Sequence, residues 1–595
     1  MTPEQMQKIP EIEDLVKGLD GEPAPSTYPY AVDNGRTVRY RETKDGTVVE
    51  PLCNFSAEIE EEIILDDGAE STRAFVLGGT LQGGGLLPSV RIPASRFSAM
   101  TWVTESWGMR AVVRAGNGTK DCLREAIQLL SPEARLRHVY THTGWRKIEN
   151  QWIYLSGSTA GNNDFEVDLG PELSRHKLPT VIDDEVGAVK LSLELLNIAP
   201  LRITAPLFAA CYRAALVSAF PQDMSLWLEG KTGSMKSTIA ALFLGHFGDF
   251  ERLQLPGAWA STANQLERRA FLLKDTLFVI DDFAPTPLDH REMELKASRL
   301  LRAQGNRSGR GRLKSDLTDR PAYYPRGIII STGEQHPAGQ SVLARTLLIE
   351  VTRDDIDVQK LTLIQKQTAR LAHAMAGYVR WLAPQMDDMP GLLREAFVSA
   401  RTKATTGAEH LRIPEAAAHL WLGLHCGITY AREIGAIDEA GAARLLEDCW
   451  GALIQIGQEQ AHVVEQENPV RRFLTVLLTI ITQARVMIIS TDDIRPEPKP
   501  GVEFLGWRDD EWFYLLPEAT FAAVSRFCRD TGEQYPIREN RLRKDLAQAG
   551  ISDCHAGHLT TTKRIGTDVH RVLKLNIKKI EVITGVTAST VGNQW

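Results

Sequence analysis

The chain has 595 residues, which is too many for one hydrophobic core and predicts about three or four domains. Hydrophobic residues make up 43% and charged residues 24%, values typical of soluble globular material. The net charge of −8 excludes a protein that is coated with nucleic acid on all sides. Any binding to a polyanion must therefore use local basic clusters.

The cysteines and the apolar segments bear on location. The seven cysteines are scattered and never form a Cys-x-x-Cys pair, which favours a reducing cytoplasm. Residues 1–25 are polar and charged, unlike a signal peptide. The most apolar window near the C-terminus, Phe473–Ile489, contains Gln483 and Arg485 and predicts a buried helix followed by a strand. We expect a soluble, cytoplasmic protein with no membrane partner.

After a flexible segment at residues 1–27, residues 28–180 predict a β-rich domain. The segments Glu58–Leu65 and Thr72–Leu81 flank an Asp-Asp-Gly turn and predict a hairpin. This part also alternates aromatic and basic residues, namely Trp102, Trp107, Trp145 and Trp152 with Arg110, Arg114, Arg146 and Lys147. Such tryptophans either stack on single-stranded nucleic acid or pack in a core. The sequence leaves both interpretations open.

A strand, a glycine loop and a helix follow the helical stretch of residues 185–220. Leu226–Leu228 has strand character, and Lys236 begins an apolar helical pattern. A loop of this kind binds polyphosphate through its backbone N–H groups and the helix N-terminus, while a lysine reaches the outer phosphates and a hydroxyl ligates Mg²⁺. Lys236 and Ser237 fit those two roles. The predicted nucleotide-binding residues are Gly230, Lys231, Thr232, Gly233, Ser234, Met235, Lys236, Ser237 and Thr238.

One residue departs from the phosphate-binding pattern. Met235 stands where a glycine is expected, and Gly233 is the residue expected to supply the missing flexibility. The competing interpretation is a glycine-containing turn from strand to helix with a surface lysine at Lys236.

A second motif supports nucleotide chemistry. Residues Thr276–Phe283 form an apolar run that ends in two carboxylates, as expected of a strand buried on both faces. Asp281 is expected to hold the Mg²⁺ shell, and Asp282 to orient or deprotonate the attacking water. Alone, such a run is usually a strand that enters a turn. Together, the two motifs predict a nucleoside triphosphatase.

A basic segment lies between this strand and the next one. Residues Arg302–Arg320 contain six basic residues and two acidic ones and predict an inserted flexible hairpin that contacts phosphates. A solvated surface loop is the alternative. The next strand, within Arg326–Glu334, places Ser331 or Thr332 where either could sense the γ-phosphate. Arg345 then precedes a strand at residues 346–351 and acts either in trans on a neighbouring subunit's nucleotide or in a structural ion pair.

The C-terminal third predicts two further domains. Residues 356–465 have helical periodicity and form a lid or a bundle. Residues 466–582 contain three helical candidates followed by a two-stranded wing, the pattern of a winged helix, and residues 583–595 form a tail. From Arg538 to Lys579 there are ten basic residues and four acidic ones. Arg538, Arg541 and Lys544 recur at helical spacing and could face a DNA backbone, although winged helices also dock proteins.

With these residues assembled, the middle of the chain, about residues 201–351, resembles the AAA+ helicases of phages, plasmids and integrative elements. These are relatives of the superfamily III and MCM-like hexameric helicases. The resemblance implies an α/β P-loop AAA+ ATPase core at residues 181–355, between the β-rich N-terminal domain and the helical plus winged-helix C-terminal region. It also implies that the basic hairpin lines the channel of a ring, with Arg307, Arg310, Arg312 and Lys314 as the DNA contacts. Ser331 or Thr332 would be sensor 1, and Arg345 the trans-acting arginine. The sensor strand ends in Ser-Thr instead of the usual asparagine.

The expected function is that of an ATP-dependent, ring-forming DNA translocase or helicase that serves replication of a mobile genetic element. ATP and Mg²⁺ are the expected cofactors. Single-stranded or forked DNA and further copies of the chain, with a hexamer as the expected ring, are the expected partners. An AAA+ protein remodeller or helicase loader, or a nucleotide-switched DNA-binding protein, are the alternatives.

Overall fold

The computed structural model describes residues 29–157, 165–309, 312–313, 319–320, 322–405, 412–492, 501–531, 535–554 and 558–586. Residues 165, 312–313, 319–320 and 412 are described by their backbone alone. The contacts divide the chain into two units. The first comprises residues 1–141 and 160–168, and the second comprises residues 142–159 and 169–595. Among the described residues, none of the helices is both long and apolar enough to cross a bilayer.

The first unit contains two β-sheets. The smaller sheet is formed by β1 (Tyr30–Asp33), β2 (Arg36–Thr43) and β3 (Gly46–Pro51). The larger sheet has the order β10-β7-β4-β5-β6, with strands β4 (Phe55–Asp66), β5 (Ser71–Leu81), β6 (Leu86–Pro93), β7 (Arg135–Tyr140) and β10 (Phe165–Val167). β4 and β5 pair antiparallel across the predicted Asp-Asp-Gly turn, which confirms that hairpin.

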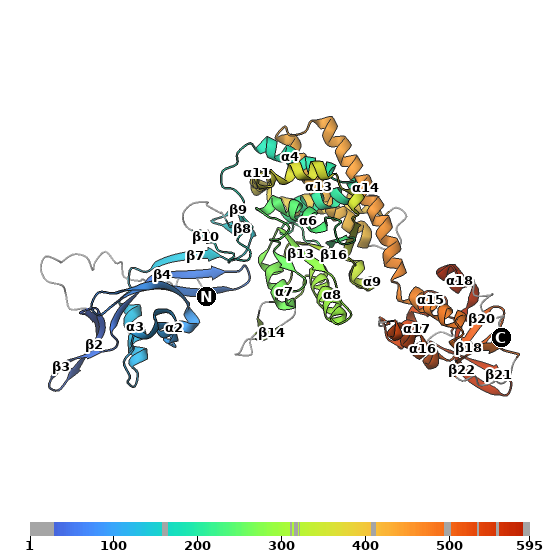
Figure 1. Cartoon of the computed structure of the whole chain (residues 1–595), viewed down its shortest axis with the longest axis horizontal. Coiled ribbons are helices and arrows are strands. Elements are labelled where there is room, and N and C mark those ends of the chain that lie inside the picture. The colour runs from blue at the N-terminus through green and yellow to red at the C-terminus, as the bar shows by residue number, and fades with distance from the viewer. Residues whose placement is uncertain are drawn as a thin grey trace, which may run out of the picture. The chain divides into compact units, whose positions relative to one another are not determined.

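Short helices cover one face of this larger sheet (Figure 1). They are α1 (Ala94–Phe97), α2 (Thr101–Trp107) and α3 (Thr119–Leu129). Trp102 and Trp107 of α2 are 1% and 7% exposed and pack edge to face in this core. Because their ring faces are covered, the interpretation of these two tryptophans as a stacking surface for nucleic acid is wrong. Trp145, which lies in the second unit and is 2% exposed, is excluded for the same reason.

A hairpin begins the second unit and is fixed by one buried carboxylate. The hairpin consists of β8 (Gly144–Ile148) and β9 (Gln151–Leu155). Asp275 is fully buried and accepts hydrogen bonds from the backbone N–H of Trp145 at 3.0 Å and of Ser218 at 2.8 Å. Lys274 Nζ lies 2.5 Å from the same carboxylate. These contacts join the hairpin to the strand that follows Asp275. From sequence alone, the hairpin is predicted to belong to the N-terminal domain.

The centre of the second unit is a five-stranded sheet in which every neighbouring pair of strands is parallel. In spatial order its strands are β12 (Gly257–Ala258), β13 (Leu277–Phe283), β16 (Ile328–Gly333), β11 (Ser225–Glu229) and β17 (Thr346–Glu350). Parallel strands covered on both faces are expected to be apolar throughout, and β16 is buried at every residue. After β11 the chain crosses to the edge strand β12, continues through β13 and β16, and then forms β17 on the other side of β11. The carboxyl end of β11 is therefore a topological switch point, where α/β sheets bind ligands.

Helices surround this sheet, and Figure 1 shows α4, α11 and α13 together beside α6. Alternate residues of β11, β13, β16 and β17 share one core with α5, α6, α11 and α13. The helices are α4 (Glu185–Glu194), α5 (Leu201–Ala214), α6 (Lys236–Leu244), α7 (Ala263–Leu272), α8 (His290–Asn306), α9 (Gln340–Leu343), α10 (Val358–Gln365), α11 (Leu371–Leu382), α12 (Met389–Ala404), α13 (Arg412–Glu433) and α14 (Glu439–Gln466). Thr262 caps α7 by accepting a hydrogen bond from the N–H of Gln265.

The residues after α14 form a C-terminal module with its own core. Its mixed sheet has the order β18-β19-β20-β22-β21. The elements are α15 (Pro469–Thr482), β18 (Val486–Ser490), β19 (Glu503–Arg508), β20 (Trp512–Leu515), α16 (Pro517–Asp530), α17 (Glu539–Gln548), β21 (Thr561–Ile565), β22 (Asp568–Asn576) and α18 (Ile577–Thr584). The three predicted helices and the terminal pair of strands are confirmed, whereas β19 and β20 are additional. The predicted segment at residues 1–27 and residues 587–595 of the predicted tail lie outside the described residues.

Candidate functional site

The loop between β11 and α6 is shaped by glycines. Gly233 has a φ of +84°, a conformation that side chains rarely adopt. At Gly230 an added Cβ would lie 2.2 Å from the carbonyl oxygen of Val351, so only glycine fits beside the end of β17. The loop therefore turns tightly at the switch point and leads directly into the first turn of α6. This is the strand, loop and helix that the sequence predicts.

Met235, the residue that replaces an expected glycine, has left-handed backbone geometry with a φ of 66°. A non-glycine residue in this region costs roughly 1–2 kcal/mol. The side chain is half-buried and packs against the main core of the unit. The loop thus keeps the backbone conformation that glycine favours, while Met235 adds apolar contacts.

Lys236 points back into the glycine loop. Its Nζ donates hydrogen bonds to the carbonyl oxygens of Gly230 at 2.6 Å and Lys231 at 3.0 Å. The residue is only 9% exposed, and burial lowers the pKa of its ammonium group. Four carboxylates around the loop oppose part of that shift, in the order Glu334, Asp281, Asp282 and Glu229. The structure therefore places a cation at the centre of the predicted phosphate-binding loop.

Asp281 links its own strand, β13, to helix α6 and to the neighbouring strand β16. Its Oδ1 accepts a hydrogen bond from Ser237 Oγ at 2.7 Å and another from Thr332 Oγ1. Ser237 is the second residue of α6, and Thr332 lies near the end of β16. One carboxylate and one hydroxyl, completed by substrate phosphates and waters, form the kind of oxygen set by which Mg²⁺ is usually bound. Ser237 and Asp281 thus fit the predicted metal site.

Asp282 leaves the regular geometry of β13. The register between β13 and β16 shifts between Ile280 and Phe283, and Asp282 has a φ of 65°. The shift turns Phe283 into an aromatic cluster, where its ring centroid lies 5.1 Å from that of Trp227. The backbone N–H of Asp282 donates to Thr332 Oγ1 at 3.2 Å, while its side chain is exposed. A bulge of this kind re-aims a side chain at the end of a strand.

Strand alternation separates the two candidate sensor residues. Thr332 faces Asp281, as described above. Ser331 points to the opposite face of the sheet, is fully buried, and accepts a hydrogen bond from Trp259 Nε1 at 2.6 Å. Of the two hydroxyls, that of Thr332 is the one that donates a hydrogen bond to Asp281.

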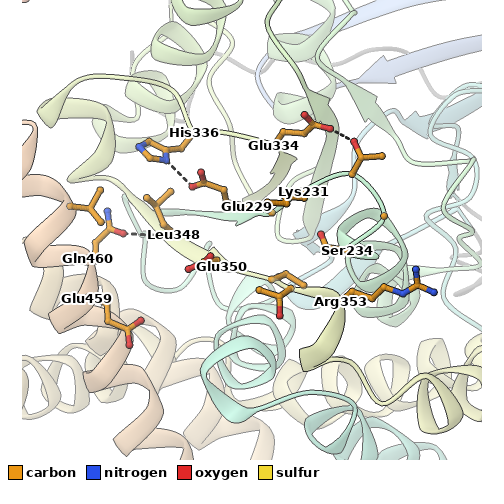
Figure 2. Close-up of a pocket in the computed structure, with 16 residues that line it drawn as sticks. Glu229, Lys231, Ser234, Glu334, His336, Leu348, Glu350, Arg353, Glu459 and Gln460 are labelled. Atoms are coloured by element: carbon orange, nitrogen blue, oxygen red, sulfur yellow. Dashed lines mark hydrogen bonds and ion pairs between the residues drawn. The ribbon is translucent and has the colours of Figure 1, made fainter.

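A cavity of about 790 Å³ lies beside the loop and is lined in part by residues outside both predicted motifs. Figure 2 shows Glu334 directed toward the loop and His336 directed toward Glu229. Glu334 Oε1 accepts a hydrogen bond from Thr232 Oγ1. The other walls come from β17, the turn that follows it and α14, including Leu348, Glu350, Arg353, Glu459, Gln460 and Val463. The sequence signals for this part of the cavity are two charged residues, one immediately before Gly230 and one immediately after Gly333.

Glu229 and His336 form an ion pair within this cavity. Oε2 of Glu229 and Nδ1 of His336 are 2.7 Å apart. Burial opposes the charged form of the ring, but the hydrogen bond and charge of Glu229 outweigh it and raise the pKa of His336. The pair links the last residue of β11 to the segment after β16.

Arg345 lies at the amino ends of the parallel strands, whereas the glycine loop lies at their carboxyl ends. It directly precedes β17, whose first residue Thr346 pairs with Ser225 at the start of β11. The loop follows the other end of β11, about 15 Å away at the usual rise of a strand. Arg345 Nη1 donates to the carbonyl oxygen of Ser341 at 2.6 Å. The geometry separates Arg345 from the loop of its own chain.

The basic segment after α8 is described only in part. The helix continues to Asn306, so the segment starts later than predicted, and β14 (Arg312–Leu313) pairs antiparallel with β15 (Asp319–Arg320). Arg307 is exposed, and its guanidinium lies 6.0 Å from the ring centroid of Tyr324. Arg310 and Lys314 lie outside the described residues, and Arg312 is described by its backbone alone.

The three basic candidates of the C-terminal module lie on or next to α17. Arg538 is its N-cap residue, and Arg541 and Lys544 follow at helical spacing. All three are exposed, whereas Leu542 and Leu546 on the other side of the helix are buried. Arg541 Nε lies 2.9 Å from Asp545 Oδ1. The helix therefore presents a basic face to solvent.

Comparisons with known proteins bear on the fold. No protein-family model and no curated protein matches this sequence. Among solved structures, the chain is similar to one described as "SCCmec type IV Cch - active helicase", with a TM-score of 0.55 and 14% sequence identity. The match covers 94% of this chain and 99% of that chain. The likeness of fold therefore extends over nearly the whole length of both proteins.

Proposed function

We propose that the chain is an ATP-driven DNA translocase or helicase with a P-loop AAA+ core. The single observation that carries this proposal is the cluster in which Asp281 accepts hydrogen bonds from Ser237 and Thr332 beside the loop that contains Lys236. A helix N-terminus, a loop cation and a carboxylate with a hydroxyl are the groups that phosphoryl transfer from a nucleoside triphosphate requires.

The residues have distinct roles in this scheme. The loop residues 230–238 bind the phosphates of ATP, and Lys236 contacts the outer two. Ser237 and Asp281 hold Mg²⁺, which neutralises charge on the phosphates when it is bound. Thr332 orients Asp281 through its hydroxyl. Catalysis then rests on positioning and on charge neutralisation, because phosphoryl transfer needs little covalent chemistry from the protein.

DNA is the proposed track of this motor. Arg307, Arg310, Arg312 and Lys314 belong to the basic segment, and Arg538, Arg541 and Lys544 belong to the C-terminal module, which we propose to be a winged helix. Clusters of this kind neutralise phosphates without reading sequence. The similarity in fold to a protein described as an active helicase supports DNA unwinding over protein remodelling, and its SCCmec description supports a role in replication of a mobile element.

We also propose a ring, with a hexamer as its expected size. Arg345 and the glycine loop lie at opposite ends of the strands in the parallel sheet. An arginine in that position reaches a nucleotide only if the nucleotide belongs to a neighbouring copy. A monomer is therefore expected to hydrolyse ATP slowly, and turnover per chain is expected to rise with protein concentration.

The decisive experiment compares the wild type with Lys236→Ala. ATP hydrolysis is measured with and without single-stranded DNA, together with displacement of a labelled strand from a forked duplex. DNA-stimulated hydrolysis and displacement that disappear in the variant are the expected result. Hydrolysis indifferent to DNA, without displacement, would instead favour a protein remodeller or loader. DNA affinity that changes on ATP binding, without displacement, would favour a nucleotide-switched DNA-binding protein.

The basic segment has its own test. The double variant with Arg310→Ala and Arg312→Ala is expected to lose stimulation by DNA while it keeps DNA-independent hydrolysis. Stimulation equal to that of the wild type would remove the segment from the DNA path.

A further inference from the structure

Glu334 lies against the glycine loop although it belongs to neither predicted motif. It follows Gly333, the last residue of β16, and its carboxylate accepts a hydrogen bond from the hydroxyl of Thr232 in the loop. Among the carboxylates around Lys236, Glu334 has the largest opposing effect on the pKa of that ammonium group, ahead of Asp281 and Asp282. Figure 2 shows its side chain directed from the end of β16 toward the loop.

Backbone hydrogen bonds on two sides hold Glu334 in this position. The N–H of Glu334 donates to the carbonyl oxygen of Phe283 at 3.3 Å, and the N–H of Gly230 donates to the carbonyl oxygen of Gly333 at 3.2 Å. An added Cβ at Gly333 would lie 2.9 Å from the Phe283 carbonyl oxygen. Glu334 is thus tied to the ends of both β11 and β13, the two strands that carry the loop and the acidic pair.

Asp282 is the carboxylate for which the sequence predicts the water-activating role. The register shift in β13 and its φ of 65° place Asp282 beyond the regular end of the strand. Its side chain is also one methylene shorter than that of a glutamate. Of the two carboxylates, Glu334 is the one that contacts the loop.

We propose that Glu334, and not Asp282, is the carboxylate that orients and deprotonates the water attacking the γ-phosphate. This inference rests on the proposed nucleotide hydrolysis. The water oxygen forms a bond to the γ-phosphorus, and the bond from that phosphorus to the β–γ bridging oxygen breaks. The electron pair of that bond leaves with ADP, and the water proton passes to the Glu334 carboxylate before it is released to solvent. Inorganic phosphate is the second product.

The test compares the full-length variants Glu334→Gln, Asp282→Asn and Glu292→Gln. Glu292 is the matched control because it is exposed on α8 and does not line this cavity, so its variant removes one negative charge away from the loop. Two quantities are measured for each protein: the dissociation constant of a fluorescent ATP analogue and the steady-state rate of ATP hydrolysis. After incubation with labelled ATP, the bound nucleotide is then extracted and assayed as ATP or ADP.

Glu334→Gln is expected to lower turnover by about a hundredfold or more, the size of a general-base contribution. Its nucleotide affinity should be equal to or tighter than that of the wild type, and the bound nucleotide should remain ATP. Glu292→Gln should turn over normally, and Asp282→Asn should lose less than tenfold. Turnover of Glu334→Gln within threefold of the wild type, or loss of its nucleotide binding, would overturn the assignment. A wild type that binds no nucleotide would instead contradict the proposed function itself.

Discussion

Arg345 and Asn306 are joined by a hydrogen bond of 3.0 Å between Nη2 and Oδ1. Asn306 is the last residue of α8, and the basic segment begins at the next residue, Arg307, whose backbone is left-handed. The aliphatic part of Arg345 lies against Gly305, where an added Cβ would be 2.3 Å from Arg345 Cδ. The arginine proposed to act on a neighbouring copy is therefore attached to the end of the helix from which the proposed DNA contacts depart.

This relationship predicts the effect of Asn306→Ala. The substitution removes one anchor of Arg345 without touching the glycine loop. We expect DNA-independent ATP hydrolysis to stay within twofold of the wild type, while its stimulation by single-stranded DNA falls several-fold. ATPase assays across a DNA titration measure both. Glu292→Ala, an exposed change on the same helix, is the control and should behave as the wild type. Full stimulation of Asn306→Ala would show that the contact is only structural.

At position 235 we expect glycine to give a more stable protein than alanine, the reverse of the usual order. Glycine normally destabilises a helix terminus or loop relative to alanine, because it loses more conformational freedom on folding. Here the backbone is left-handed, so alanine keeps the strain of about 1 kcal/mol while it loses the packing of methionine. Met235→Gly is therefore expected to be more stable than Met235→Ala by about 1 kcal/mol. Chemical denaturation of both variants measures the difference, and alanine being the more stable variant would contradict it.

The two hydroxyls at the end of β16 predict separable effects. Thr332→Val keeps the shape of the side chain but removes the donor to Asp281 and the acceptor of the Asp282 N–H, and is expected to lower ATP turnover per folded molecule about tenfold or more. Ser331→Ala leaves the indole N–H of Trp259 without its buried acceptor and is expected to cost about 1–3 kcal/mol of stability. Turnover per folded molecule should then stay close to the wild type. The reverse pattern would assign the sensing role to Ser331.

His336 predicts a dependence of stability on pH. Its pKa is raised in the folded chain by Glu229, with further contributions from Glu467 and Glu294. The stabilisation is therefore fully present below the unfolded pKa of about 6.5 and is lost as the pH rises through the folded value. His336→Gln should lower the melting temperature most at pH 5.5 and progressively less toward pH 8.5. A difference that grows with pH would contradict this sign.

Local patterns in the sequence predicted the parts of the site that depend on neighbouring residues. The glycine loop, the start of α6 and the apolar run to Asp281 are each encoded within about ten residues, where strand and helix periodicities are readable. The hairpin of β4 and β5 and the helices of the C-terminal module were predicted for the same reason. These elements all have strong internal periodicity or turn residues.

The remaining features depend on contacts between distant segments. Strand alternation separates Ser331 from Thr332, but which of the two faces Asp281 depends on how β16 pairs with β13, which no single segment specifies. The bulge at Asp282 turns Phe283 toward Trp227 on another strand, a contact that no local pattern predicts. Glu334 lies just after a strand, where no strand or helix periodicity predicts the direction of its side chain. The attachment of β8 to Asp275 joins residues 130 positions apart.

The return of the chain to its first unit has a consequence for how the protein comes apart. The chain enters the second unit at His142, goes back for residues 160–168, and leaves again at Leu169. Within that return, β10 pairs in parallel with β7 over three residues. A protease that cuts once between Thr141 and His142 therefore leaves two fragments that still share a β-ladder. They should migrate together in native chromatography and separate only in denaturant.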